Sequence, residues 1–199
     1  GSARPMAQDW LAGWLTRYGT GKGPGWVPDL VGRRQIRWIS HALFVMSGQE
    51  PRETRAFYAA LGRQADFLAR RWRSTSHGLP RFEALTGLIY SACSLIGVAH
   101  HLKPALKALA QECAREIDAS GGIITRNPEE LLQVFTLLTW TAAVLAESGK
   151  NPDPAVNTAI MRMAPTLRSL RHADGGLARF QGGGRGQVGR LDHALAQSG

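Results

Sequence analysis

Cysteine, lysine and long hydrophobic runs are all scarce in this sequence of 199 residues. Its two cysteines, Cys93 and Cys113, lie in separate helical patterns without metal-ligand spacing, which predicts free buried thiols rather than a disulfide framework. No apolar run approaches the roughly 20 residues that cross a bilayer, so no membrane span is expected.

Strict apolar–polar alternation and catalytic signature motifs are missing as well. Only two stretches, Gly122–Thr125 and Leu177–Gln181, have the character of short extended pieces. No GxSxG or HExxH motif is present, and the glycine-rich stretch 182–189 lacks the Lys-Ser/Thr ending of a phosphate-binding loop. The residues therefore predict no metal, no nucleotide and no other cofactor in this chain.

The dominant pattern is helical. Segments of about 15 to 22 residues with apolar residues three and four apart alternate with Gly-, Ser- and Pro-rich breaks. Asn127 followed by Pro128, Glu129 and Glu130 is a helix start, because the Asn side chain can accept hydrogen bonds from the free N–H groups of the first turn. The prediction is an all-α fold of six or seven antiparallel helices, arranged as a bundle or as part of an α/α barrel or toroid.

Positive charge is the main compositional signal. The chain has 24 basic and 15 acidic residues, a net charge of +9, and all but four of the basic residues are arginine. A positive field attracts nucleic acid, acidic polysaccharide or an anionic surface. An arginine-rich composition also follows from a GC-rich genome, and both readings stay open. Nucleic acid is not an expected partner, because no nucleic-acid-binding motif is present.

A few residues stand out as binding candidates. Indoles stack on sugar rings, and Trp26 follows a Gly/Pro loop that favours exposure, although tryptophan also simply fills cores. Trp38 lies one helical turn after Arg34 and shares its face. Arg126 precedes the capped helix and is not explained by the cap itself.

Three segments carry a family resemblance: GWVPDLVGRRQIRWISHA, SGGIITRNPEELLQVFTLL and MAPTLRSLRHADGGLARFQGG. Together they resemble the N-terminal helical domain of the heparinase II/III-like polysaccharide lyases, over about Gln8 to Arg190. The resemblance implies an incomplete α/α toroid over residues 1–180. Residues 181–199 would then be a Gly-rich linker toward a C-terminal β-sandwich domain outside this chain. It also implies β-elimination of an acidic, uronic-acid-containing polysaccharide, and a periplasmic location.

The resemblance transfers binding residues more fully than proton-transfer residues. Arg34, Trp38, Arg126 and His172 match, and with Trp26 they are the expected polysaccharide-binding residues. The Asn-His pair of the family corresponds to Gly78-Leu79-Pro80, and its Tyr and His correspond to Glu130 and Leu131. The remaining acid/base candidates are His77 and Glu130.

Two hypotheses follow from this pattern. The chain is the toroid part of a lyase that is active in the full-length protein, or it is a degenerate, non-catalytic glycan-binding or structural module.

Overall fold

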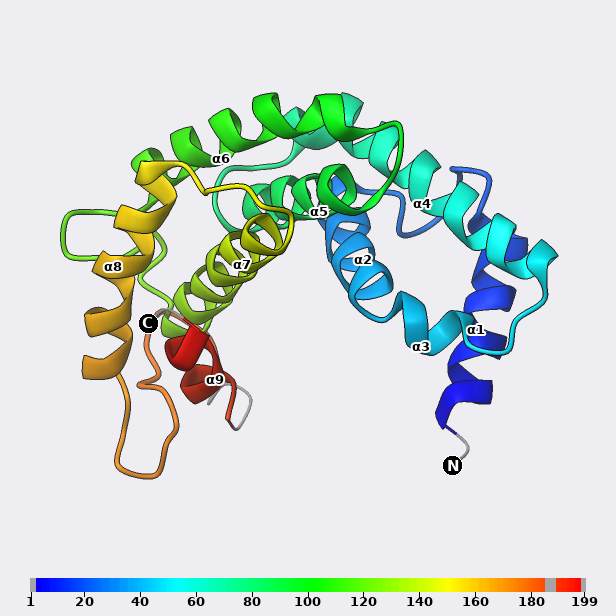
Figure 1. Cartoon of the computed structure of the whole chain (residues 1–199). Coiled ribbons are helices and arrows are strands. Elements are labelled where there is room, and N and C mark those ends of the chain that lie inside the picture. Colours follow the sequence, from blue (N-terminus) through cyan, green and yellow to red (C-terminus); the bar gives the residue numbers. More distant parts are fainter. Residues whose placement is uncertain (1–2, 185–188, 198–199) are drawn as a thin grey trace. The chain divides into compact units, whose positions relative to one another are not determined.

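The computed structural model describes residues 3–184 and 189–197, and its regular structure is helical (Figure 1). Within these ranges no strand forms. Two isolated bridges, Ile117–Ile123 and Arg171–Leu177, lie at the stretches predicted to be extended. The all-α prediction is confirmed. The helices are α1 (Ala3–Tyr18), α2 (Pro28–Ser40), α3 (Ala42–Met46), α4 (Pro51–Arg71), α5 (Leu79–Ser94), α6 (Leu102–Glu116), α7 (Pro128–Glu147), α8 (Pro154–Ser169) and α9 (Arg190–Gln197), with the 3-10 turns η1 (Trp72–Ser74) and η2 (Ala99–His101).

Helix starts follow the cap chemistry of the sequence. The Asn127 side-chain oxygen accepts hydrogen bonds from the N–H groups of Glu129 and Glu130, at 3.0 and 3.4 Å. Asp153 caps α8 by accepting from the N–H of Ala155 at 2.9 Å. Proline is the first residue of α2, α4, α7 and α8, where its missing N–H costs no helical hydrogen bond. The predicted cap at Asn127 is thus confirmed.

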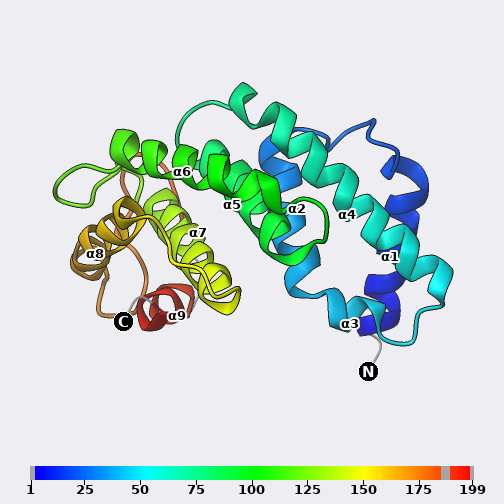
Figure 2. The same ribbon diagram turned by 45° about the horizontal axis from the view of Figure 1, so that its top comes forward.

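The chain divides into two compact units. The first comprises residues 1–75 and 83–103, and the second comprises residues 76–82 and 104–199. In the first unit α2 packs on α4, and α1 packs on α3 and α4, as both ribbon views show (Figures 1 and 2). Leu11, Phe57 and Leu61 form a buried cluster there, against which Trp38 and other half-buried apolar side chains pack. This cluster joins α1, α2 and α4.

Two glycines let α2 and α5 approach closely within the first unit. A Cβ atom added to Gly32 would overlap the backbone carbonyl of Glu83, and one added to Gly87 would overlap the backbone of Gly32. Because neither position has room for a methyl group, this crossing needs glycine on both helices.

The second unit is built around α7. This helix packs on α8 and α9, and α7 and α8 run side by side in both ribbon views. Leu191 and Ala194 of α9 are buried. Cys113 is a buried free thiol, whose pKa burial raises to about 12, and Cys93 is a half-buried free thiol. The fully buried side chains of α7 and α8 include Leu132, Phe135, Leu138, Leu145, Val156, Met163 and Leu167.

Helix α7 has the length and hydropathy of a membrane span, and 61% of its apolar window is buried inside the protein. A core helix passes the same test, so this single helix is a weak argument for membrane insertion. The predicted Gly-rich tail, 181–199, contains α9, while residues 185–188 and 198–199 lie outside the described part of the chain. The predicted domain boundary after residue 180 stays a prediction.

Candidate functional site

The loop between α6 and α7 is organised by Asp118. Its Oδ1 accepts hydrogen bonds from the N–H and hydroxyl groups of Ser120, at 2.9 and 2.7 Å, and from the N–H of Gly122 at 2.9 Å. The hydrogen bonds from Ser120 and Gly122 lower the pKa of Asp118, and the nearby positive charge of Arg126 lowers it further by a smaller amount. Asp118 is therefore an ionised, structural carboxylate at neutral pH.

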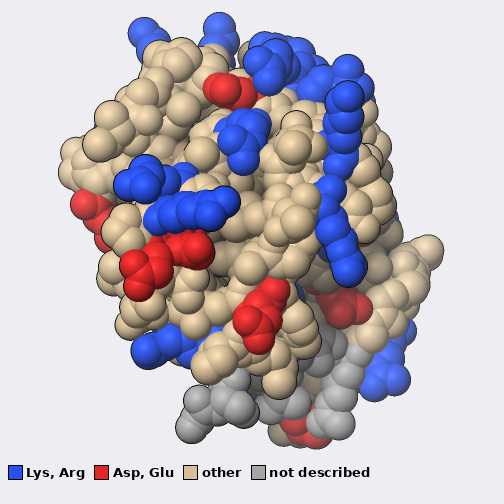
Figure 3. Space-filling model, turned by 90° about the vertical axis from the view of Figure 1, so that its right-hand side faces the viewer, with Lys and Arg blue, Asp and Glu red and all other residues tan. Residues whose placement is uncertain are grey.

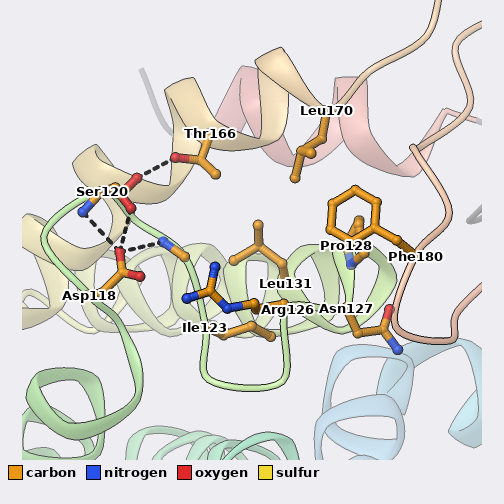
Figure 4. Close-up of a pocket in the computed structure, with 11 residues that line it drawn as sticks. Asp118, Ser120, Ile123, Arg126, Asn127, Pro128, Leu131, Thr166, Leu170 and Phe180 are labelled. Carbon is orange, nitrogen blue, oxygen red and sulfur yellow. Dashed lines mark hydrogen bonds between the residues drawn. The ribbon is translucent and has the colours of Figure 1, made fainter.

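The same loop is fastened to α8. The Thr166 hydroxyl donates to the carbonyl of Ser120, as Figure 4 shows. Gly121 has φ +80°, and a Cβ atom there would overlap the carbonyl of Arg162. The sequence Ser-Gly-Gly thus lets the loop lie directly on the α8 backbone.

Arg126 occupies an unusual backbone conformation. Its φ is +53°, in the left-handed region that non-glycine residues rarely adopt, and its N–H donates to the carbonyl of Ile123 at 3.0 Å. The side chain is exposed and extends toward Asp118 (Figure 4). No described residue accepts a hydrogen bond from its guanidinium group. Residues held in such rarely populated backbone conformations cluster at functional positions.

Arg126 lies at the rim of a hollow of about 200 Å³. Its lining has two parts, an apolar one and a polar rim of Asp118, Arg126, Asn127 and Thr166. Ligand pockets commonly have about 300–1,000 Å³, so this hollow suits one apolar side chain with a polar neighbour. The apolar lining residues are Ile123, Pro128, Leu131, Leu170 and Phe180.

Arg34, Trp26 and Trp38 come together in the first unit, along with Trp14. The guanidinium carbon of Arg34 lies 4.2 Å from the ring centroid of Trp14, and 5.6 and 5.8 Å from those of Trp26 and Trp38. Such distances give favourable cation–π attraction. Trp14 and Trp26 are also stacked, with centroids 6.1 Å apart.

Arg34 also makes two polar contacts, while its buried Nη2 has no hydrogen-bond partner among the described residues. Its Nε donates to Gln64 Oε1 at 2.6 Å, and Nη1 donates to the carbonyl of Gly25 at 3.1 Å. Burial lowers the pKa of Arg34 to about 10, so the side chain is still charged at neutral pH. In the described structure this arginine joins α1, α2 and α4 as part of the packing. We call Arg34, Trp14, Trp26 and Trp38 the arginine–tryptophan cluster.

The other predicted site residues belong to the second unit. His77 Nδ1 lies 2.9 Å from Glu112 Oε2, and Glu130 lies in the capped first turn of α7. His172 is exposed in a tight turn, where its N–H donates to the carbonyl of Gly176 at 2.8 Å. Arg126 and His172 are thus both in the second unit, but only Arg126 lines the hollow.

Several residues that line the hollow were not predicted from the sequence. Asp118 and Ser120 had a usable signal, because Asp followed by Ser two residues later and by glycine predicts a side-chain-capped turn. Thr166 and Phe180 had none, since nothing local to those positions indicates that the chain returns to the Arg126 loop.

One relative identified by sequence comparison is FtsZ-localized protein C of Caulobacter vibrioides. It is 30% identical to this chain over 186 residues, which are 92% of this chain and 32% of that protein. The chain therefore spans about a third of the relative's length. No family model matches the chain, and no solved structure matches it.

These findings overturn the heparinase II/III-like interpretation. The relative that aligns with nearly the whole chain has a different name, and no lyase family model matches. The lyase function, the acidic polysaccharide partner and the glycan-binding alternative lose their basis with it. The residues behind the resemblance have structural explanations: Asn127 is a helix cap, Arg34 packs against tryptophans, and Asp174 closes a turn by accepting from the N–H of Gly176 at 2.9 Å.

Proposed function

We propose that this chain is a helical module of a protein that acts in cell division at the position of FtsZ. The observation that carries the proposal is the 30% identity, over 92% of the chain, to FtsZ-localized protein C. Because the similarity covers 32% of that relative, the proposal concerns the contribution of this module to such a protein.

Within the module, the hollow beside Arg126 is the proposed docking point for a segment of a partner protein. Its apolar lining favours an aliphatic or aromatic side chain, and the guanidinium of Arg126 favours a neighbouring carboxylate. The net charge of +9 adds long-range attraction for an acidic partner. Figure 3 shows one face of the molecule, on which basic side chains cover more area than acidic ones.

The toroid arrangement of the helices is also a proposal. The pairs α2 with α4 and α7 with α8 are the proposed hairpins of an incomplete α/α toroid, supported by their packing within each unit. Small-angle X-ray scattering of the purified chain tests this arrangement. A curved arc gives a larger radius of gyration than a compact bundle, and a compact-bundle profile would contradict the toroid.

Localisation of the complete natural protein tests the functional proposal. A fluorescent fusion is expected to lie with FtsZ at the division site and to disperse when FtsZ is depleted. A fusion that stays dispersed while FtsZ rings are present would refute it.

The docking point is tested separately in the same cells. Arg126→Glu is expected to weaken co-localisation, because it places a carboxylate where the partner's carboxylate would bind. Arg162→Glu, at an exposed α8 position outside the hollow, is the matched control with the same change of charge. Equal behaviour of the two variants would remove the hollow from the proposal and leave the localisation intact.

A further inference from the structure

A second cluster of polar side chains lies apart from the hollow, between the loop before α5 and the end of α6. His77, Glu112 and Glu116 each offer one ligand atom, and these three atoms lie within 4.8 Å of one another. Glu112 and Glu116 are four residues apart on α6, so both carboxylates are on one face of that helix. The same spacing brings two metal-ligating side chains together in helical zinc motifs.

The two carboxylates are buried. Glu112 is 3% exposed and Glu116 is 7% exposed. Glu112 Oε1 accepts from the N–H of Gly78 at 2.8 Å, and Glu116 Oε1 accepts from Arg115 Nε at 3.3 Å. Two like charges one helical turn apart repel each other, and a cation bound by both carboxylates would reduce this repulsion.

The backbone of Gly78 lies close to carboxylate oxygens of two helices. Its φ is +82°, and a Cβ atom added there would lie 3.6 Å from Glu116 Oε2 and 3.8 Å from Glu130 Oε1. Carboxylate oxygens from α6 and α7 therefore both lie near this glycine. Glu130 borders the three-residue cluster and adds a further negative charge.

Two arginines, Arg81 and Arg115, lie beside the cluster. Arg81 Nη1 lies 2.8 Å from His77 Nδ1, but 3.9 Å from Glu112 Oε2, beyond hydrogen-bond distance. Arg115 Nε lies 3.3 Å from Glu116 Oε1, and the Arg115 side chain is 59% exposed. Arg81 would compete with any other cation that enters the cluster.

We propose that His77, Glu112 and Glu116 bind a divalent first-row transition-metal ion, with Zn²⁺ as the representative probe. One imidazole nitrogen and two carboxylate oxygens are ligands that zinc accepts at about 2.0–2.2 Å, which places neighbouring ligand atoms roughly 3.3 Å apart in a tetrahedron. His77 Nδ1 and Glu112 Oε2, at 2.9 Å, are already close to that separation. The Gly78 N–H orients Glu112, as groups outside the ligand set commonly do in metal sites.

Titration of the untagged, chelator-treated chain with Zn²⁺ tests the proposal. Binding is measured by calorimetry, and by visible absorbance when Co²⁺ replaces Zn²⁺. One equivalent is expected to bind to the wild-type chain, with a rise in the melting temperature. His77→Ala and Glu116→Gln are each expected to weaken binding by at least about 10-fold, because each removes one of three ligands. The double variant His100→Ala/His101→Ala, which removes an adjacent pair of histidines elsewhere, is expected to bind like the wild type.

The variant Arg81→Gln tests whether a metal ion or the Arg81 guanidinium neutralises the charge of the two carboxylates. If the site takes a metal, this variant binds Zn²⁺ more tightly, because a competing cation is gone. No binding by the wild-type chain at millimolar Zn²⁺, or binding that survives His77→Ala unchanged, would overturn the proposal. The experiment uses the purified chain, so its outcome is independent of the localisation proposed above.

Discussion

Arg126 holds a left-handed backbone conformation without the freedom of glycine. That conformation costs a non-glycine residue on the order of 1–2 kcal/mol. Arg126→Gly is therefore expected to stabilise the fold by up to about 1 kcal/mol after the greater entropy of glycine in the unfolded chain is subtracted. Urea denaturation measures the change, with Arg126→Ala as the control that removes the guanidinium and keeps the strain. A Gly variant less stable than the Ala variant would contradict this account of position 126.

Asp118 gives the loop an acid-sensitive contact. Its folded-state pKa is lowered from the ordinary 3.8 by the hydrogen bonds from Ser120 and Gly122. A depressed carboxyl pKa contributes stability that is fully present above the ordinary value and is lost as the pH falls through the lowered one. Asp118→Asn is expected to reduce the loss of stability below about pH 4. Denaturation of both proteins at a series of pH values checks this, and parallel pH profiles would show that Asp118 makes no such contribution.

At the scale of helices, the crossing of α2 and α5 depends on two glycines. Gly32→Ala is expected to destabilise the protein by about 1–3 kcal/mol, because the methyl group would overlap the Glu83 backbone. Gly62→Ala is the matched control on α4, where a Cβ atom meets nothing within 4 Å. Since alanine favours helix over glycine, that variant is expected to gain up to about 1 kcal/mol. Thermal unfolding measures both, and equal shifts for the two variants would contradict the close crossing.

Helices were predictable from sequence where they are long and periodic. The Asn127 cap, followed by Pro128, predicted the start of α7. The short α9 was not predicted, because it follows a glycine-rich stretch and is too short to show a clear apolar pattern. Its apolar side is recognisable only from the structure, in which Leu191 is buried in the second unit. Local pattern determines such an element less than tertiary contact does.

The candidate site was predictable only in part. Arg126 was singled out because the cap does not explain it, but its left-handed backbone depends on the turn from Ile123 and was not visible in the sequence. Thr166 and Phe180 reach the hollow from positions about 40 to 55 residues away along the chain. Contacts at such separation arise from the packing of α7 and α8, which one sequence does not specify.

At the scale of the molecule, charge is divided unevenly between the units. The first unit has 13 basic and 6 acidic residues, a net charge of +7, and the second has 11 and 9, a net charge of +2. Exposed arginines on α4, including Arg52, Arg55 and Arg70, account for much of the excess. The field that attracts anions is therefore expected to come mainly from the first unit.

Cation-exchange chromatography tests this uneven distribution. The pair Arg52→Glu/Arg55→Glu changes the net charge by the same amount as the pair Arg162→Glu/Arg168→Glu in the second unit. The α4 pair is expected to lower the eluting salt concentration more, because charges act over roughly a Debye length of about 10 Å and the resin orients the most basic face. Equal elution of the two variants would show that only total charge matters.

The uneven distribution of tryptophan, including the arginine–tryptophan cluster, allows the two units to be distinguished by fluorescence. Five of the six tryptophans belong to the first unit, and only Trp140 belongs to the second. Indole emission therefore reports almost entirely on the opening of one unit, while helical ellipticity reports on both. If the units unfold separately, fluorescence and ellipticity will show different unfolding transitions. The fluorescence transition will then report the loss of contact between Arg34 and the surrounding tryptophans.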